Sequence, residues 1–134
     1  MRTAAASGAA FLATTPSSAD PYNPKAVRAA MGAHFHIPIR PDTPWEELRD
    51  LFRGKQILLA DPQGPVPYFA VDWTLPSVLV IGGEARGATD GARKLAHRVI
   101  SIPMARPIES LNAAVAAGVI LYEAFRQRLL SRSP

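Results

Sequence analysis

The sequence predicts an α/β domain built on a mostly parallel sheet. Segments typical of strands alternate along the chain with segments typical of helices, and this alternation favours parallel strands connected by helices. The run at residues 77–83 ("SVLVIGG") is continuously apolar and ends in glycines, as in buried parallel strands. A length of 134 residues allows one sizeable core but not two. We therefore expect a single domain over residues 1–134.

The first part of the chain predicts a helix that ends at Gly8, a strand, a second helix and a second strand. Residues 9–14 ("AAFLAT") suit a short buried strand. Asn23 suits the N-cap of a helix with Pro24 in its first turn, and Gly32 suits its end. Residues 34–39 ("HFHIPI") alternate between polar and apolar side chains, which predicts a strand or the entry to a strand.

The remainder of the chain predicts three helices and three strands. Residues 42–54 suit a helix that stops at a glycine, and residues 55–61 ("KQILLAD") suit a strand. Residues 62–76 are rich in proline and predict irregular structure. Beyond the apolar strand and a short helix, residues 97–104 predict the last strand and residues 110–130 the last helix.

Composition narrows the range of functions. The absence of cysteine excludes disulfides and thiolate metal sites, and the three histidines are poorly spaced for a metal site. The net charge of +4 and the pI near 10.0 suit a polyanionic partner such as nucleic acid without requiring one. The longest apolar run is shorter than the roughly 20 residues of a membrane span. We expect no metal and no membrane partner.

The first candidate site is the loop "VIGGEARG" at residues 80–87. Ligands of open α/β sheets bind beyond the carboxyl ends of strands, and glycines allow the backbone to approach a ligand closely. The glycines are Gly82, Gly83 and Gly87, and Glu84 is the one acid among them. The pattern is neither a dinucleotide fingerprint nor a Walker motif. By itself it is equally compatible with a plain turn.

The second candidate site is "ISIPMARPIESLN" at residues 100–112. Two prolines favour an irregular loop with free backbone groups, and the first amides of the following helix favour an anion. The polar residues Glu109, Ser110 and Asn112 precede the apolar run of that helix. They could cap the helix or line a pocket.

Taken together, these segments resemble the SpoU/TrmH branch of the SPOUT RNA methyltransferases. The resemblance rests on "VIGGEARG" and "ISIPMARPIESLNAAVAAGVILYEAFRQR", on their separation, and on "DPYNPKAVRAAMGAHFHIPI" and "RTAAASGAAFL" earlier in the chain. It covers nearly the whole sequence. Several motifs in the right order are more specific than any one of them.

The resemblance implies an α/β sheet with helices on both faces and a C-terminal trefoil knot, a feature that is rare among proteins. It implies S-adenosyl-L-methionine as the methyl donor and a ribose 2′-hydroxyl of rRNA or tRNA as the acceptor. It also implies a homodimer with the active site near the dimer interface. We expect the protein in the cytoplasm or in an organelle.

The resemblance also assigns candidate site residues. The positions that match cofactor-binding positions are Gly82, Gly83, Gly87, Ile102, Met104 and Leu111. The positions that match the catalytic pocket are Arg2, Glu84, Ser110 and Asn112. The candidate RNA-binding residues are Arg28, Arg86 and Arg106, each equally compatible with an ordinary surface arginine. A guanidinium keeps its proton at physiological pH, so we assign Arg2 to electrostatic stabilisation rather than to proton abstraction.

The N-terminus departs from the family pattern. Arg2 directly follows Met1, whereas the family has a strand and an Asn-containing turn before this arginine. We therefore expect the first strand of the sheet to be missing and the domain to be incomplete at its N-terminus. Two alternatives to an active methyltransferase remain: a truncated, catalytically silent domain that binds cofactor or RNA or only dimerises, and an unrelated nucleotide-binding α/β protein.

Overall fold

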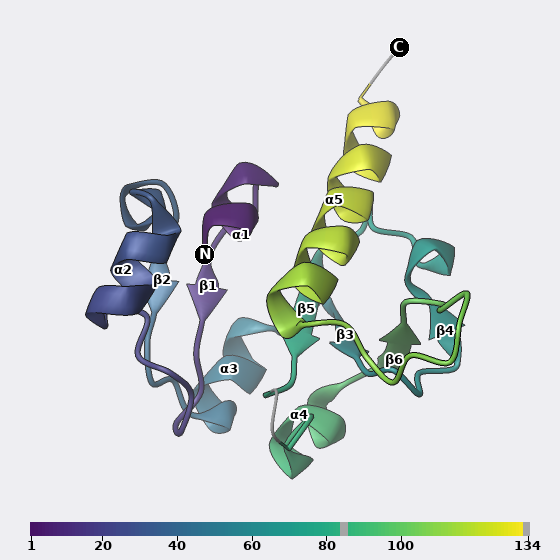
Figure 1. Cartoon of the computed structure of the whole chain (residues 1–134), viewed down its shortest axis with the longest axis horizontal. Helices are drawn as coiled ribbons and strands as arrows, with labels where there is room; N and C mark the ends of the chain where they lie inside the picture. Colours follow the sequence, from purple (N-terminus) through teal and green to yellow (C-terminus); the bar gives the residue numbers. More distant parts are fainter. Residues whose placement is uncertain (84–85, 133–134) are drawn as a thin grey trace. The chain divides into compact units, whose positions relative to one another are not determined.

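The computed structural model describes residues 1–83 and 86–132 (Figure 1). Contacts divide the chain into two compact units, Met1–Asp50 and Leu51–Pro134, and each is described by itself. The single domain remains a prediction. No helix among the described residues is long and apolar enough to cross a membrane.

Unit 1 contains a two-stranded parallel sheet and short helices. Strand β1 (Leu12–Ala13) pairs with β2 (Ile39–Arg40). The helices are α1 (Arg2–Ala6), α2 (Pro24–Ala30), the 3-10 helix η1 (Ala33–Phe35) and α3 (Trp45–Leu51). The strand predicted at residues 9–14 is confirmed, although it is shorter and only half-buried.

Helix α2 begins and ends close to the predicted residues. The Asn23 side chain accepts a hydrogen bond of 2.8 Å from the Ala26 N–H, and Pro24 is the first helical residue. Met31 and Gly32 then both adopt left-handed backbone, with φ of 49° and 83°. This reversal leads into η1, so a strand over residues 34–39 is wrong, whereas the entry to a strand is confirmed at Ile39, the first residue of β2. The apolar residues of the segment do not share one face, because Phe35 is exposed and Ile37 is buried.

Unit 2 is organised around a four-stranded parallel sheet. Its strands are β3 (Gln56–Ala60), β4 (Val66–Pro67), β5 (Ser77–Ile81) and β6 (Arg98–Ser101). They lie in the order β4-β6-β3-β5, and every pair is parallel. The helices are η2 (Tyr68–Ala70), α4 (Asp90–Leu95) and α5 (Ala113–Ser131). The predicted parallel α/β fold is confirmed.

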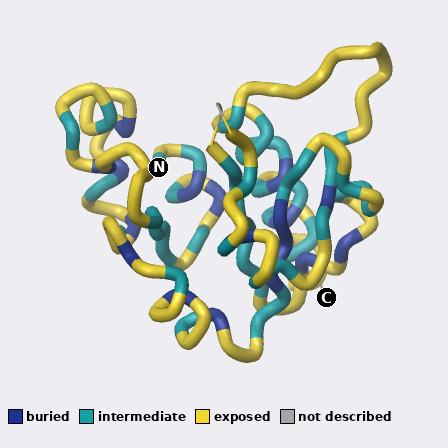
Figure 2. The backbone as a smooth tube through the Cα atoms, turned by 90° about the horizontal axis from the view of Figure 1, so that it is seen from below, coloured by how far each residue is buried: buried dark blue, intermediate teal, exposed yellow. Residues whose placement is uncertain are grey.

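The core of unit 2 lies between one face of this sheet and helix α5. Leu58 on β3 and Ile100 on β6 pack with Ile120 and Ala124 of α5 and with the buried Trp73. Figure 2 shows the buried residues along the inner strands and the exposed residues in the loops. Strand β5, which we predicted to be buried, is half-buried at all five residues, because it lies at the edge of the sheet and β3 takes the central position.

Candidate functional site

Three loops of unit 2 follow the carboxyl ends of neighbouring strands and lie at the same end of the sheet. Strands β5 and β6 both pair in parallel with β3. The segments after Ile81, Ala60 and Ser101 therefore begin at the same end of the sheet, where the carboxyl ends of the strands lie. Two strand spacings amount to about 10 Å. The glycine turn at residues 82–87 and the loop at residues 102–112 therefore start from strands that are close together rather than from opposite sides.

The glycine turn after β5 is closed by two backbone hydrogen bonds. The Gly83 N–H donates to the Gly87 carbonyl oxygen at 3.0 Å, and the Gly87 N–H donates back at 2.9 Å. Gly87 has a left-handed φ of 64°. A Cβ on Gly82 would lie 2.6 Å from the Gly87 carbonyl carbon, which is too close for any side chain. Glu84 lies outside the described residues, and Arg86 is exposed in the turn.

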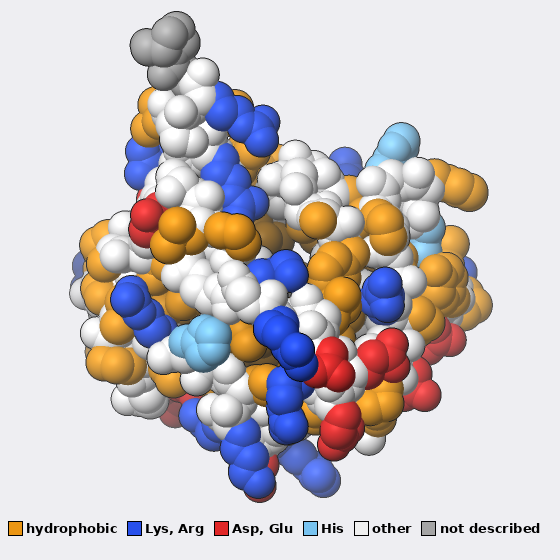
Figure 3. Space-filling view, turned by 180° about the vertical axis from the view of Figure 1, so that it is seen from behind, with side chains coloured by type: hydrophobic (Ala, Val, Ile, Leu, Met, Phe, Trp, Pro, Cys, Tyr) orange, Lys and Arg blue, Asp and Glu red, His pale blue; other side chains and the backbone are white. Residues whose placement is uncertain are grey.

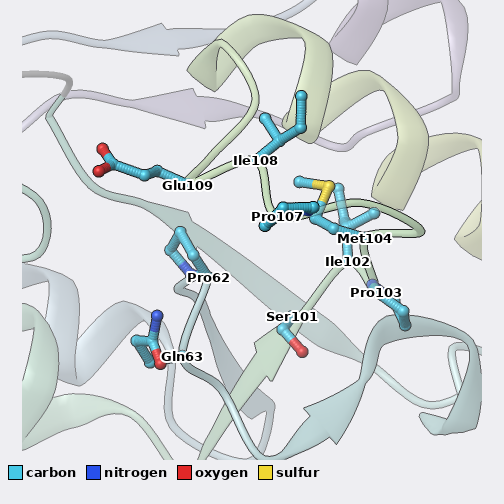
Figure 4. A pocket seen from close by; sticks show the side chains of 9 residues that line it. All are labelled: Pro62, Gln63, Ser101, Ile102, Pro103, Met104, Pro107, Ile108 and Glu109. Carbon is cyan, nitrogen blue, oxygen red and sulfur yellow. The ribbon is translucent and has the colours of Figure 1, made fainter.

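The loop after β6 forms a surface pocket of about 390 Å³. Its lining residues are Pro62, Gln63, Ser101, Ile102, Pro103, Met104, Pro107, Ile108 and Glu109. Figure 4 shows the side chains of Ile102, Met104 and Pro107 clustered on one side, with the Glu109 carboxylate extending away from them. Ile102 also packs against the core. The pocket thus combines a mainly apolar wall with one carboxylate and one amide.

The loop after β3 supplies the opposite wall of this pocket and was missed by the sequence analysis. Gln63 comes from this loop, whose shape depends on Gly64: a Cβ there would lie 2.5 Å from the backbone of Ile100. The Asp61 N–H also donates to the Ile100 carbonyl oxygen at 2.9 Å. The segment had been assigned only to irregular structure, yet its position directly after a central parallel strand was a signal for a site.

An ion pair fixes the loop after β3 to helix α4. Arg93 donates from Nη2 to Asp61 Oδ2 at 2.9 Å, and the Gln63 N–H donates to Asp61 Oδ1 at 2.9 Å. These two hydrogen bonds, with the backbone N–H of Gln63 the larger influence, hold the pKa of the Asp61 carboxyl below its ordinary value. Asp61 is therefore an anionic anchor beside the pocket.

The polar residues before α5 have different environments. Asn112 is the N-cap, and its Oδ1 accepts from the backbone N–H groups of Ala114 at 2.9 Å and Val115 at 3.2 Å. These two amides already donate to Asn112, so they are not free to bind an anion as expected. The helix also begins three residues later than the predicted Ser110, because residues 106–112 remain extended or bent. Glu109 lines the pocket, while Ser110 is exposed in the loop.

The structure brings together only part of the predicted site. Ile102 and Met104 share the pocket, whereas its lining includes none of the following predicted residues: Gly82, Gly83, Gly87, Leu111, Ser110 and Asn112. Arg106 is exposed in the loop after β6. In unit 1, Arg2 begins α1 and Arg28 lies on α2, and both are exposed. Within the described ranges, no group of three or more His, Cys, Asp or Glu side chains could hold a metal ion.

The sequence of this chain matches a known protein family, and the match includes both loops. The model of the SpoU rRNA Methylase family matches residues 1–122. This chain belongs to the SpoU rRNA methylase family. The predicted resemblance is thereby confirmed, and the glycine turn and the pocket loop both fall within the matched residues of this SpoU chain.

The relatives agree with this assignment. The chain is 41% identical, over 141 residues, to the 23S rRNA (uridine(2479)-2′-O)-methyltransferase of Streptomyces viridochromogenes, covering 99% of this chain and 49% of the relative. It is 32% identical to an uncharacterised tRNA/rRNA methyltransferase of Synechocystis, covering 100% of this chain and 50% of the relative. The SpoU chain thus spans about half the length of these curated relatives.

Solved structures show the same fold. The SpoU methyltransferase AviRb of Streptomyces viridochromogenes, solved in complex with the cofactor AdoMet, superposes with a TM-score of 0.89 at 38% identity, over 96% of this chain and 51% of that one. An AdoMet-bound rRNA methyltransferase of Sinorhizobium meliloti superposes with a TM-score of 0.84 at 35% identity, over 93% of this chain and 49% of that one. The C-terminal trefoil knot stays a prediction for this SpoU chain.

Proposed function

We propose that this chain is the methyl-transfer part of an RNA 2′-O-methyltransferase that uses S-adenosyl-L-methionine and acts on a ribose of rRNA or tRNA. The observation that carries the proposal is the pair of loops that leave β5 and β6 at one edge of the parallel sheet. These loops lie in a chain that resembles an rRNA 2′-O-methyltransferase and AdoMet-bound SpoU structures. Parallel-sheet edges of this kind are where α/β proteins bind nucleoside cofactors.

The residues at this edge suit the cofactor. A cavity of about 390 Å³ falls within the usual range for small-molecule sites, about 300–1,000 Å³. The apolar side chains of Ile102, Met104 and Pro107 can cover a flat adenine ring. We assign the predicted cofactor-binding residues to this site: Gly82, Gly83, Gly87, Ile102, Met104 and Leu111.

The chemistry requires positioning more than activation. When bound, S-adenosyl-L-methionine supplies an electrophilic methyl group, so the main task of the protein is to align a ribose oxygen with it. That hydroxyl must lose its proton during attack. Arg2 stays protonated and therefore stabilises the developing alkoxide or an adjacent phosphate, with the proton passing to phosphate or water. Glu84, Ser110 and Asn112 orient the hydroxyl.

RNA binding rests on positive charge at the surface. Arg28, Arg86 and Arg106 are all exposed, and the chain carries a net charge of +4. Figure 3 shows lysine and arginine side chains at several places on the visible surface, some of them next to acidic side chains. Exposed lysine and arginine side chains bind phosphates without reading sequence. Because the proposed substrate is cellular RNA, we also propose that the protein acts in the cytoplasm.

A homodimer is part of the proposal. Val115, Tyr122 and Leu129 recur at intervals of seven along α5 and are 53%, 48% and 49% exposed. Residues seven apart lie nearly above one another on a helix. This apolar stripe faces away from the buried Ile120 and Ala124 and suits a second copy of the chain.

Calorimetry with S-adenosyl-L-methionine, followed by single-turnover methyl transfer to bulk rRNA and tRNA, tests the proposal. We expect binding, transfer to a ribose 2′-oxygen, and a loss of about 10²–10³ in the transfer rate for Arg2→Ala, the usual effect of removing one electrostatic stabiliser. Arg49→Ala, an exposed arginine on α3, is the matched control. Binding without transfer would indicate a catalytically silent domain, and the absence of both would reject the proposal.

A further inference from the structure

Phe35 is the most exposed large apolar side chain among the described residues, with 91% of its surface accessible. It is the last residue of η1, and its neighbours Ala33 and Ile37 are buried. The Phe35 N–H donates to the Gly32 carbonyl oxygen at 3.1 Å. The ring is therefore presented to solvent by an anchored backbone rather than by a loose loop.

Further contacts fix the surroundings of this ring. The His34 ring lies at hydrogen-bond distance from the Pro21 carbonyl oxygen, 2.7 Å from Nε2, and its centroid is 5.1 Å from that of Tyr22. Tyr22 itself is 53% exposed. Helix α2 ends in the left-handed residue Met31, which is 72% exposed. Aromatic and apolar side chains are thus held at the surface of one small helical element.

The charged side chains in residues 21–39 are both basic. Lys25 and Arg28 lie on α2 and are exposed. The sequence from residue 21 to residue 39 ("PYNPKAVRAAMGAHFHIPI") contains no aspartate and no glutamate. Cations beside exposed aromatic rings are the combination that binds single-stranded nucleic acid, because phosphates pair with the cations and bases stack on the rings.

We propose that Tyr22, Lys25, Arg28, Met31 and Phe35, which we name the α2–η1 platform, bind unpaired nucleotides of the RNA substrate. Phe35 stacks on a nucleobase, and Lys25 and Arg28 contact phosphates. The inference deepens the proposed function and rests on RNA being the substrate. Only an unpaired nucleotide offers a free base face, because the bases of a duplex are stacked on each other.

A second copy of the chain is a poorer occupant for the platform. A two-fold contact brings the same surface of both subunits together. Near the two-fold axis Lys25 and Arg28 would approach their own equivalents, and the nearest carboxylate in the sequence, that of Asp20, already accepts a hydrogen bond from the Tyr22 N–H at 2.9 Å. An RNA strand supplies the negative charge that a second copy lacks.

Fluorescence anisotropy with a short single-stranded RNA and with a duplex of the same sequence tests the platform. We expect Phe35→Ala to weaken binding of the single strand about 5- to 100-fold, the range for loss of one base–aromatic stack, and to leave duplex binding unchanged. Phe35→Trp should bind as tightly as the wild type. Phe69→Ala, at an aromatic residue 54% exposed on η2, is the matched control and should have no effect.

Two further measurements identify the contacts. An abasic single strand should bind equally to the wild type and to Phe35→Ala, because the stacked base is absent from both complexes. Lys25→Gln with Arg28→Gln should reduce the slope of log K against log salt by about 1.4, since each phosphate contact on a single strand contributes about 0.7.

Several results would overturn the proposal. One is that Phe35→Ala binds the single strand as tightly as the wild type, or loses as much affinity for the duplex as for the single strand. Another is that the wild type does not bind RNA. A third is that Phe35→Ala has a lower molar mass than the wild type in size-exclusion chromatography with light scattering. The last result would show that a second copy covers the ring. If methyl transfer is absent but single-strand binding still depends on Phe35, the proposed function fails and the platform stands.

Discussion

Gln127 on α5 holds the backbone of Trp73 in place. The Trp73 N–H donates to the Gln127 side-chain oxygen at 2.9 Å, and the Gln127 amide nitrogen donates to the Val71 carbonyl oxygen at 3.1 Å. The Trp73 indole N–H donates in turn to the Tyr68 carbonyl oxygen at 2.8 Å, and the ring is 2% exposed. One glutamine therefore satisfies two backbone groups in the segment that leads into a buried tryptophan.

Replacing Gln127 with alanine is expected to lower the free energy of unfolding by about 1–3 kcal/mol, because a buried backbone N–H and carbonyl lose their partners. Urea denaturation measures the change. Leu130→Ala, at a leucine 61% exposed on the same helix, is the matched control and should change stability little. Equal losses in the two variants would contradict this role for Gln127.

The two adjacent glycines after β5 offer a matched pair of substitutions. Gly82→Ala introduces a methyl group 2.6 Å from the Gly87 carbonyl carbon, whereas Gly83→Ala meets no atom within 4 Å. We expect Gly82→Ala to distort the turn at a cost of about 1–3 kcal/mol and to weaken binding of S-adenosyl-L-methionine in calorimetry. Gly83→Ala should bind nearly as the wild type, and a stronger effect at Gly83 would refute this account of the turn.

The Asp61–Arg93 pair predicts a pH dependence of stability. The pKa of Asp61 is lowered in the folded state by the Gln63 N–H and the Arg93 guanidinium, so the folded protein binds the proton more weakly than the unfolded chain does. The stabilisation is complete well above the unfolded pKa of about 4 and is lost as the pH falls through that value towards the folded pKa.

Asp61→Asn retains an oxygen for the Gln63 N–H but removes the charge. We expect it to cost about 1 kcal/mol at neutral pH, because the Arg93 side chain is 51% exposed and solvent screens the pair, although Asp61 is only 16% exposed. We also expect it to flatten the stability profile below about pH 5. Thermal unfolding at a series of pH values measures both effects. Glu46→Gln, at an exposed carboxylate on α3, is the control. An unchanged pH profile for Asp61→Asn would show that the Asp61–Arg93 pair does not cause the pH dependence.

The apolar stripe on α5 predicts the assembly state. Tyr122→Glu places a charge in the centre of the stripe and should convert a dimer to a monomer in light scattering, because burial of an unpaired charge is costly. Leu75→Glu, at a leucine 51% exposed outside α5, should leave the mass unchanged. A wild-type chain that is already monomeric at high concentration would exclude the dimer.

Local signals explain what could be predicted of the fold. Asn23 and Gly32 marked the ends of α2 because capping and left-handed backbone depend on a few neighbouring residues. The alternation of residues 34–39 predicts a strand, yet it does not report burial, because Phe35 is exposed and Ile37 is buried. Trp73 became the core tryptophan through its bonds to α5, some 54 residues away, and no local pattern in a proline-rich segment reports such a contact.

In the candidate site, too, features with local sequence signals could be predicted and features that depend on long-range contacts could not. The loops after β5 and β6 were found because glycines, prolines and strand ends are visible in the sequence. The contribution of Gln63 was not found, since it depends on β3 lying between the other two strands. The N-cap role of Asn112 against two specific amides likewise depends on where α5 begins.

The position of β6 constrains the order in which the chain can reach its native state. Strand β6 is the last strand in the sequence, yet it lies between β4 and β3. During synthesis from the N-terminus, β3 and β5 are the strands of this sheet that can pair before residue 98 has left the ribosome. Until then β4 has no neighbour to join, and one side of β3 stays unpaired. The sheet is therefore completed only after about three quarters of the given sequence has been made.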